Sequence, residues 1–355
     1  YEIHIILTDG KNKKPYYELH PSITLHQLDI NYDEMYGRTL PKRILGYWKK
    51  QRLFKKRLNE CLCNIRPDIT ISLLRRDINF INKVKDGSIK IGEIHFNKSD
   101  YRAFNDNHLP MFLQRIVKEH WRRQLIRQLR QLKRFIVLSH EDAAQWTELN
   151  NVSVIYNPLP FYPGVSSDNS QKQVIAVGRY VPQKGFDRLI PAWKIVSEQH
   201  PDWTLRIYGD GMREKLQQQI DSLGISSNCV LEHSVPNIVD KYCESSIFVL
   251  SSRFEGFGMV IIEAMACGVP PVSFTCPCGP RDIITDGKNG LLVENGDIEG
   301  LAGKICYLIE NEKVRKEMGK QARINVERFK IEHVAQEWRE LFETLTKQPY
   351  SDQLS

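Results

Sequence analysis

The sequence predicts an α/β protein in which two doubly wound domains face a cleft. Its 355 residues are enough for two domains that each bury a core. Short apolar, β-branched runs alternate with longer segments of helical period, which is typical of parallel sheets covered by helices on both faces. Hydrophobic residues make up 41% and charged residues 26% of the chain, so disordered, collagen-like and low-complexity classes are excluded.

The first half contains the elements of one such domain, over residues 1–160. Apolar runs predict strands at 3–8, 23–28, 69–74, 89–94, 134–139 and 152–156. Helical periodicity predicts two long basic helices at about 41–65 and 109–133.

The second half repeats this alternation over residues 161–330. Strands are expected at 173–178, 203–208, 229–232, 246–250 and 270–274, and helices at 185–199, 211–223 and 259–267. Three prolines between Asn157 and Gly164 predict a stiff extended connector. A last helix, at about 332–346, has an apolar stripe that includes Trp338 and Phe342, so residues 331–355 are expected to form a helix that crosses back to the first domain, and a tail.

Charge is distributed unevenly between the two halves. Residues 1–160 carry 28 basic and 17 acidic side chains, a net charge of +11, whereas the remainder carries 22 and 26, a net charge of −4. Residues 38–57 and 115–134 read as basic amphipathic helices with aromatic residues such as Trp48 and Trp121. Such helices bind anionic membrane surfaces when these faces are exposed; the alternative is a helix packed on the sheet with a solvated charged face. No RNA- or DNA-reading motif accompanies the charge, so no nucleic-acid partner is expected.

The eight cysteines do not predict a metal site. They are scattered, with two Cys-x-Cys pairs, no Cys-x-x-Cys and no histidine at finger-like spacing. Several lie in apolar runs, as Cys267 does, which favours buried reduced thiols.

The segment from Ser251 to Ala264 reads as a strand end, a glycine-containing loop and a helix start. Gly256 and Gly258 remove side chains where the backbone must approach a ligand. The free N–H groups at the start of the helix would point at that ligand, with the helix dipole behind them, and this arrangement suits a diphosphate. These groups belong to Gly258, Met259 and Val260.

Two carboxylates, Glu255 and Glu263, flank this helix start with seven residues between them. Both can face one pocket, and a carboxylate at the second position can accept two hydrogen bonds from a ribose diol. The alternative is that Glu255 only caps the helix and Glu263 is a solvated helix residue.

Two further loops follow predicted strands. Arg179 and Lys184 place two cations on one loop, where they can neutralise a pyrophosphate leaving group without a metal; the alternative is an ordinary exposed charged loop. The Gly209-Asp210-Gly211 turn lets the chain pass close to a nucleoside, although any turn between a strand and a helix can use glycine.

Taken together, these loops resemble the nucleotide-sugar half of retaining GT-B glycosyltransferases, in the large family four. The Glu-seven-Glu element is matched by Glu255 and Glu263, and the Gly-Arg-four-Lys-Gly element by residues 178–185. The run 279–287 followed by 289–293 also looks like the family. The resemblance covers about residues 134–346 and implies two Rossmann-like domains, the first on the acceptor side and the second binding the donor.

The resemblance also implies roles for individual residues. Arg179 and Lys184 would hold the diphosphate, Glu263 the ribose hydroxyls, and the backbone near Val235 the base. Glu255 and the 256–260 backbone would hold the donor sugar and its phosphate, and His95 resembles the family histidine that reaches across the cleft, although a lone histidine is more often structural. The expected catalytic set is Glu255, His95, Arg179 and Lys184, and the expected donor-binding set is Gly178, Gly209, Gly211, Val235, Gly256, Phe257, Gly258, Met259, Val260 and Glu263.

The activity implied is retaining, metal-independent and cofactor-free transfer of a hexose or N-acetylhexosamine from a nucleotide sugar, UDP-linked by expectation. Fixed cations and N–H groups lower the barrier because negative charge builds on the departing diphosphate. No Asp-x-Asp motif favours a metal-chelating transferase. The implied acceptor is a bacterial surface-polysaccharide intermediate, of capsule or lipopolysaccharide type, or a polyprenyl-diphosphate-linked glycan, reached by a cytoplasmic protein on the inner face of the membrane.

Two alternatives stay open: a nucleotide-sugar-binding protein without turnover, and a nucleotide-sugar epimerase of the same fold. Family members usually begin with a strand, a glycine-rich loop and a helix before the segment that matches Tyr1–Thr8. The sequence departs from the family here, and we expect this amino-terminal unit to be missing.

Overall fold

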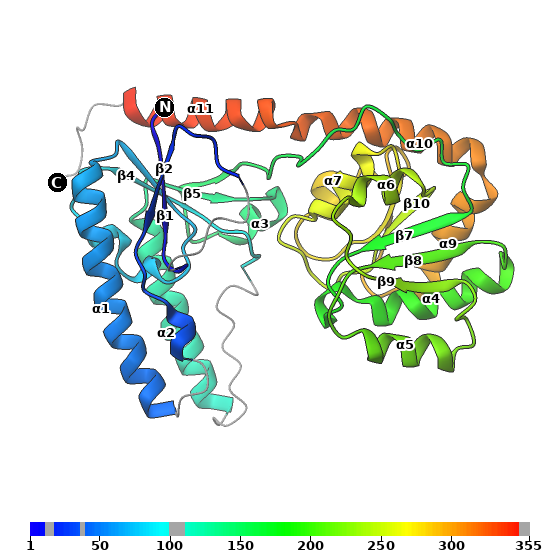
Figure 1. Cartoon of the computed structure of the whole chain (residues 1–355), viewed down its shortest axis with the longest axis horizontal. Coiled ribbons are helices and arrows are strands. Elements are labelled where there is room, and N and C mark those ends of the chain that lie inside the picture. The colour runs from blue at the N-terminus through cyan, green and yellow to red at the C-terminus, as the bar shows by residue number, and fades with distance from the viewer. Residues whose placement is uncertain (11–17, 36–39, 99–110, 348–355) are drawn as a thin grey trace.

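The structure is a computed structural model that describes residues 1–10, 18–35, 40–98 and 111–347. Arg38 of the predicted basic helix and the tail 348–355 lie outside these residues. Within them the chain forms two α/β domains with parallel sheets, joined by an extended connector and by a long carboxy-terminal helix (Figure 1). The predicted fold class is confirmed.

All six strands predicted in the first half are present. They are β1 (Ile3–Leu7), β2 (Ile23–Gln27), β3 (Ile69–Ser72), β4 (Ile89–Glu93), β5 (Arg134–Val137) and β6 (Val152–Val154). The helices are α1 (Leu40–Ile65), α2 (Met111–Arg130) and α3 (His140–Gln145), with single 3-10 turns at Tyr32–Met35, Asp77–Asn79 and Ile81–Lys83. β3 to β6 form one parallel sheet in chain order, whereas β1 and β2 pair in a separate two-stranded sheet.

The second domain is built on one parallel sheet with the order β12-β11-β10-β7-β8-β9. Its strands are β7 (Gln173–Val177), β8 (Thr204–Tyr208), β9 (Cys229–Glu232), β10 (Ile247–Leu250), β11 (Pro271–Phe274) and β12 (Leu291–Val293). Its helices are α4 (Phe186–Gln199), α5 (Arg213–Ser222), α6 (Ile238–Cys243), α7 (Met259–Ala266), α8 (Pro280–Ile283), α9 (Ile298–Glu310) and α10 (Glu312–Asn325), with 3-10 turns at Pro182–Lys184 and Val326–Phe329.

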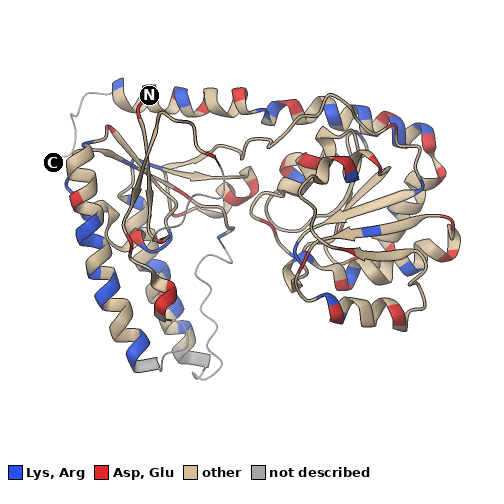
Figure 2. Ribbon diagram, in the orientation of Figure 1, with Lys and Arg blue, Asp and Glu red and all other residues tan. Residues whose placement is uncertain are grey.

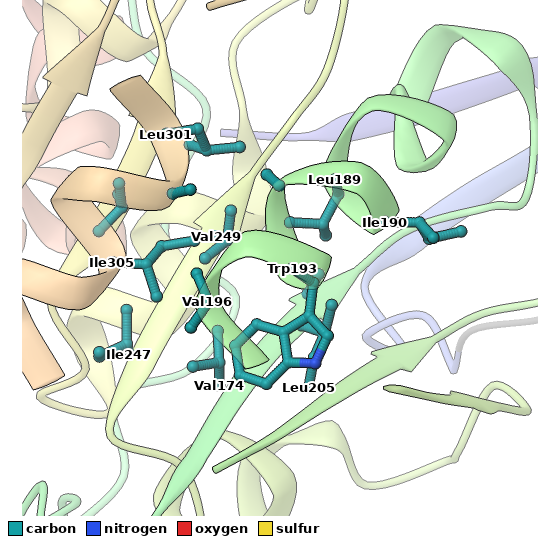
Figure 3. Packing of buried hydrophobic residues seen from close by; sticks show 14 of the residues in the cluster. Val174, Leu189, Ile190, Trp193, Val196, Leu205, Ile247, Val249, Leu301 and Ile305 are labelled. Atoms are coloured by element: carbon teal, nitrogen blue, oxygen red, sulfur yellow. The ribbon is translucent and has the colours of Figure 1, made fainter. Parts of the chain in front are cut away.

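Alternate residues of the central strands enter two separate cores, as a doubly wound sheet requires. Val174 of β7 packs with α4 and α9 on one face, while Ile175 packs with α7 on the other. Figure 3 shows the first of these cores, where the fully buried Trp193 of α4 lies against the strands. Its indole N–H donates to the Asn228 carbonyl at 3.0 Å, so the one polar atom of the ring is satisfied.

The last helix, α11 (Ile331–Lys347), leaves the second domain and packs on the first (Figure 1). Its buried Val334 and Leu345 join a core with Ile91 of β4 and Ile136 of β5. The opposite face of this sheet packs against α1 and α2. The first domain therefore depends on the carboxy-terminal helix to cover one face of its sheet.

Three aromatic rings lie at the junction of the domains. Tyr156 precedes the connector, Phe257 lies in the loop before α7, and Phe329 precedes α11. Their ring centroids are 5.1 to 5.6 Å apart in all three pairs. This cluster ties the start of the connector to the loop after β10.

Candidate active site

A pocket of about 350 Å³ lies between the two domains, at the carboxyl ends of strands from both sheets. This is where doubly wound domains bind ligands. The pocket is lined by His95, Phe96, Asn97, Leu138 and Asn157 from the first domain and by Arg179, Gln183, Lys184 and residues 254–260 from the second. A larger hollow of about 710 Å³ lies at the opposite end of the second sheet and contains no predicted site residue.

Lys184 and Glu255 form an ion pair in this pocket. The Lys184 Nζ lies 2.8 Å from Oε1 of Glu255, and the two side chains are only 14% and 8% exposed. The Ser252 hydroxyl donates to the same oxygen at 2.5 Å. Because Gly258 is the N-cap of α7 and no side chain caps that helix, the alternative that Glu255 only caps α7 is wrong.

The loops that carry this pair are braced against each other. The Arg253 N–H donates to the Gln183 carbonyl at 2.8 Å, and the Ser251 hydroxyl donates to the Lys184 carbonyl at 2.9 Å. Gly185 has a φ of +65°, and a Cβ there would lie 2.1 Å from the Ser251 carbonyl oxygen. A glycine at this position is therefore needed for the close approach that places Lys184 beside Glu255.

The start of α7 faces the same pocket through Gly258, Met259 and Val260. The first N–H groups of a helix have no acceptor within the helix, and the helix dipole makes this end favourable for an anion. Arg179 adds an exposed guanidinium at the pocket, for which no ion pair is recorded with the described residues. These groups give the pocket donors and positive charge suited to phosphate oxygens.

Glu263 does not line this pocket. It lies in α7, where its Oε2 accepts a hydrogen bond from the fully buried Tyr242 hydroxyl at 3.1 Å. Burial raises the pKa of Glu263 above its ordinary value, although the Tyr242 hydrogen bond and the Lys184 charge act in the opposite direction. The alternative of a solvated helix residue is therefore wrong.

The remaining predicted donor residues, Gly178, Gly209, Gly211 and Val235, do not line this pocket. A Cβ on Gly209 would lie 1.9 Å from the Gly178 carbonyl oxygen, and one on Gly211 would lie 2.7 Å from that of Tyr180. These two glycines thus allow close contacts between chain segments, and their predicted role beside a nucleoside stays a prediction. Val235 is half-buried against the α7 core.

Asp210 connects the Gly209–Gly211 turn to the segment next to Val235. Its carboxylate is 2.7 Å from His233 Nδ1 and also accepts hydrogen bonds from the hydroxyl and N–H of Ser234. These contacts, the Ser234 hydroxyl first, lower the pKa of Asp210 to about 2.

The first domain touches the loop before α7 directly. A Cβ on Gly256 would lie 2.2 Å from the His95 carbonyl oxygen, so this glycine permits contact between the domains as well as any approach by a ligand. The His95 ring is 41% exposed, with Nε2 3.3 Å from Glu93. The buried Asn97 amide donates to the Glu255 carbonyl at 3.4 Å.

Sequence reasoning did not find Asn97, Asn157 or Ser252. Asn97 follows β4 by four residues, so the rule that ligands lie beyond the carboxyl ends of strands would have included it. Asn157 lies in the segment read only as a connector. Ser252 carries no signal apart from its place in the loop after β10.

Two facing doubly wound domains, with a cation–carboxylate pair in the pocket between them, define a protein of the GT-B class. Residues 163–325 match the family model described as Glycosyl transferases group 1. This stretch is just under half of the chain and contains the motifs quoted above, so this part of the chain is similar to that family.

Relatives and solved structures agree with this similarity. The chain is 31% identical over 211 residues to an uncharacterized glycosyltransferase of Haemophilus influenzae, covering 58% of this chain and 60% of the relative. It is 28% identical to a poly(ribitol-phosphate) alpha-N-acetylglucosaminyltransferase of Staphylococcus aureus, covering 70% and 51%. A structure of an S. aureus TarM mutant with Fondaparinux, alpha-GlcNAc-glycerol and UDP superposes with a TM-score of 0.65 at 26% identity, covering 81% and 59%. The chain thus spans between half and three fifths of the length of these proteins.

Proposed function

We propose that the protein is a retaining glycosyltransferase that moves a hexose or N-acetylhexosamine from a UDP-sugar to a glycan acceptor. The observation that carries the proposal is the Lys184–Glu255 pair, which lies with the start of α7 and with His95 in one pocket between the domains. The S. aureus relatives support the choice of UDP and of an N-acetylhexosamine, because the name of one and the bound molecules of the other contain these groups.

The chemistry follows from where charge develops. The bond from the sugar C1 to the diphosphate oxygen breaks, and its electron pair leaves with UDP. Lys184, Arg179 and the α7 N–H groups stabilise that negative charge by fixed electrostatics. The acceptor hydroxyl forms the new bond to C1 on the same face, and its proton passes to the departing phosphate oxygen.

The remaining residues bind and orient the donor. Glu255 accepts hydrogen bonds from the donor sugar, and Lys184 beside it holds its carboxylate in place. Glu263 holds the ribose hydroxyls after a small rearrangement away from Tyr242. His95, on the first domain, contacts the sugar from the opposite wall. Because the cations belong to the chain, we expect transfer to need no divalent metal.

Release of UDP tests the proposal against both alternatives. The protein is incubated with UDP-GlcNAc and UDP-glucose, with and without polyol-phosphate and lipid-linked glycan acceptors, in the presence and absence of EDTA. We expect UDP release that depends on acceptor and is unchanged by EDTA. A binding protein would release no UDP, and an epimerase would convert the sugar without acceptor.

We further propose that the acceptor is presented at an anionic membrane surface. Ile44, Leu45 and Trp48, near the amino-terminal end of α1, are 52%, 59% and 62% exposed, whereas Phe54 farther along the helix is buried. Figure 2 shows that Lys and Arg recur along this helix, and Lys42, Arg43 and Lys49 lie beside the exposed apolar residues. Apolar side chains flanked by cations are suited to the interface of an anionic bilayer. None of the described helices is long and apolar enough to cross a membrane.

A further inference from the structure

The short helix α3 of the first domain meets the segment 277–282 of the second. The Asp282 carboxylate accepts the N–H of His140 at 2.7 Å through Oδ1 and the N–H of Glu141 at 3.2 Å through Oδ2. These N–H groups belong to the first turn of α3, so they have no acceptor within their own helix. Ser139 accepts the next one, from Asp142, at 3.0 Å. The second domain thus completes the cap of a helix in the first.

The first domain also contributes a carboxylate that binds groups of the second domain. Glu141 accepts the N–H of Cys278 at 3.0 Å through Oε2, and it pairs with the Arg281 guanidinium at 3.0 Å through Oε1. The Glu141 side chain is 26% exposed, so solvent screens this contact less than an ordinary surface pair. Glu141 and Asp282 therefore form a reciprocal contact in which each domain binds the carboxylate of the other.

The other side of the same segment supports the loop that carries Glu255. The Glu255 N–H donates to the Pro277 carbonyl at 3.0 Å. Gly279 has a φ of +124°, and a Cβ there would lie 1.7 Å from the Phe257 carbonyl oxygen, so no other residue fits without moving that loop. Residues 277–282 are thus held between α3 and the loop before α7.

We infer that Glu141 and Asp282 are positioning residues for transfer. They fix the spacing of the two domains and, through residues 277–282, the place of the Glu255 backbone relative to His95. This inference rests on the proposed function, because it concerns the geometry in which donor and acceptor react. Neither carboxylate lines the pocket, so their loss should misplace the reacting groups and leave the groups that bind UDP unchanged.

The test compares Asp282→Asn, Glu141→Gln and the double variant in steady-state transfer and in UDP binding by calorimetry. We expect kcat to fall about 10- to 100-fold, as misplacement of reacting groups does, with the UDP Kd within about threefold of the wild-type value. The double variant should be no slower than the slower single one, because both break one contact. Asp282→Glu, which keeps the charge, should recover part of kcat. Asp202→Asn, at an exposed ion pair with Lys172 far from the cleft, is the matched control and should be unchanged.

A second measurement separates this inference from the proposed function. Small-angle scattering of the chain with UDP should give a larger radius of gyration for Asp282→Asn than for the wild type. If the wild-type protein shows no transfer and Asp282→Asn still has the larger radius of gyration, the proposed function is wrong. The reciprocal contact would then still determine the spacing of the domains. Variants with wild-type kcat would overturn the positioning role, as would a loss of kcat/KM that weaker UDP binding fully explains.

Discussion

The Lys184 ammonium lies 2.8 Å from Oε1 of Glu255, and 71 residues of sequence separate the two. Each side chain satisfies the other in a half-enclosed pocket, where an unpaired charge would be costly. When a donor binds, its diphosphate and its sugar hydroxyls can share this pair, since a carboxylate offers more than one lone pair and an ammonium three donors. The pair thus holds two binding groups in place before the ligand arrives.

Substitution Lys184→Ala should weaken UDP binding by about 10- to 100-fold, the amount expected for loss of a charge-assisted hydrogen bond. It should also lower the free energy of unfolding by about 1–3 kcal/mol, because Glu255 is left poorly solvated and without its cation. Calorimetric titration with UDP and urea unfolding measure the two effects.

The double variant Lys184→Ala/Glu255→Gln distinguishes the two effects of Lys184. Replacing the unpaired Glu255 carboxylate by an amide should restore much of the free energy of unfolding, while UDP binding stays weak. Lys172→Ala, at an exposed ion pair, is the control for loss of a lysine. UDP affinity unchanged in Lys184→Ala would contradict the site.

Glu263→Gln should stabilise the protein in a pH-dependent way. Burial raises the pKa of Glu263, so in a window above the ordinary glutamate pKa of about 4.3 the folded state binds more protons than the unfolded state. The free energy of unfolding of the wild type therefore falls as the pH rises through this window. The Glu263→Gln variant does not lose this stability, because glutamine does not titrate. The difference in melting temperature should be near zero at pH 4 and should grow toward neutral pH.

The same variant should bind UDP about 10- to 100-fold more weakly if Glu263 holds the ribose hydroxyls. Stability gained together with affinity lost is typical of a binding residue whose burial costs stability. Glu244→Gln, at an exposed carboxylate paired with Lys241, should change neither property. If Glu263→Gln is less stable than wild type at pH 8, the conclusion that the buried Glu263 carboxylate costs stability is wrong.

The strands were predictable because their signals are local. β-branched apolar runs such as those at 173–178 and 246–250 stand out within a few residues of sequence. β12 was missed because it has only three residues, Leu291–Val293, behind an Asn-Gly turn. The separate pairing of β1 with β2 was not predictable, since strand partners are set by tertiary packing that the period of a single strand does not encode.

The site was predictable at the level of loops and not at the level of contacts. Lys184 and Glu255 were each identified, with separate roles, from motifs and strand ends. Their pairing, and the contact of Gly256 with the His95 carbonyl, depend on how segments from distant parts of the chain pack. The contact of Gly209 with the Gly178 carbonyl was not predictable either, because a glycine in the sequence does not reveal which neighbour requires it.

Trp48→Ser should reduce binding to anionic vesicles by about tenfold, because an indole buried at the interface contributes about 1.5–3 kcal/mol and part of this is retained by Ile44 and Leu45. Lys49→Glu should weaken binding further at low salt and less at high salt, as screening predicts. Co-sedimentation with phosphatidylglycerol vesicles, against neutral vesicles, measures both. Ile324→Ser, at a 63% exposed residue of α10, is the matched control. Equal sedimentation of all variants would count against α1 as the docking surface.

Gly256→Ala should slow transfer more than it weakens UDP binding. The added Cβ would lie 2.2 Å from the His95 carbonyl oxygen, so the loop before α7 and the first domain must separate by about 1 Å to relieve the overlap. A displacement of this size at a reacting centre can cost about 100-fold in rate. UDP Kd should stay within a few-fold, since the contact lies between the domains. Gly303→Ala, at an exposed position of α9 with no atom within 4 Å of its Cβ, is the control and should raise the free energy of unfolding by about 0.5–1 kcal/mol. Full transfer activity in Gly256→Ala would show that the domains react from a more open arrangement than the one described.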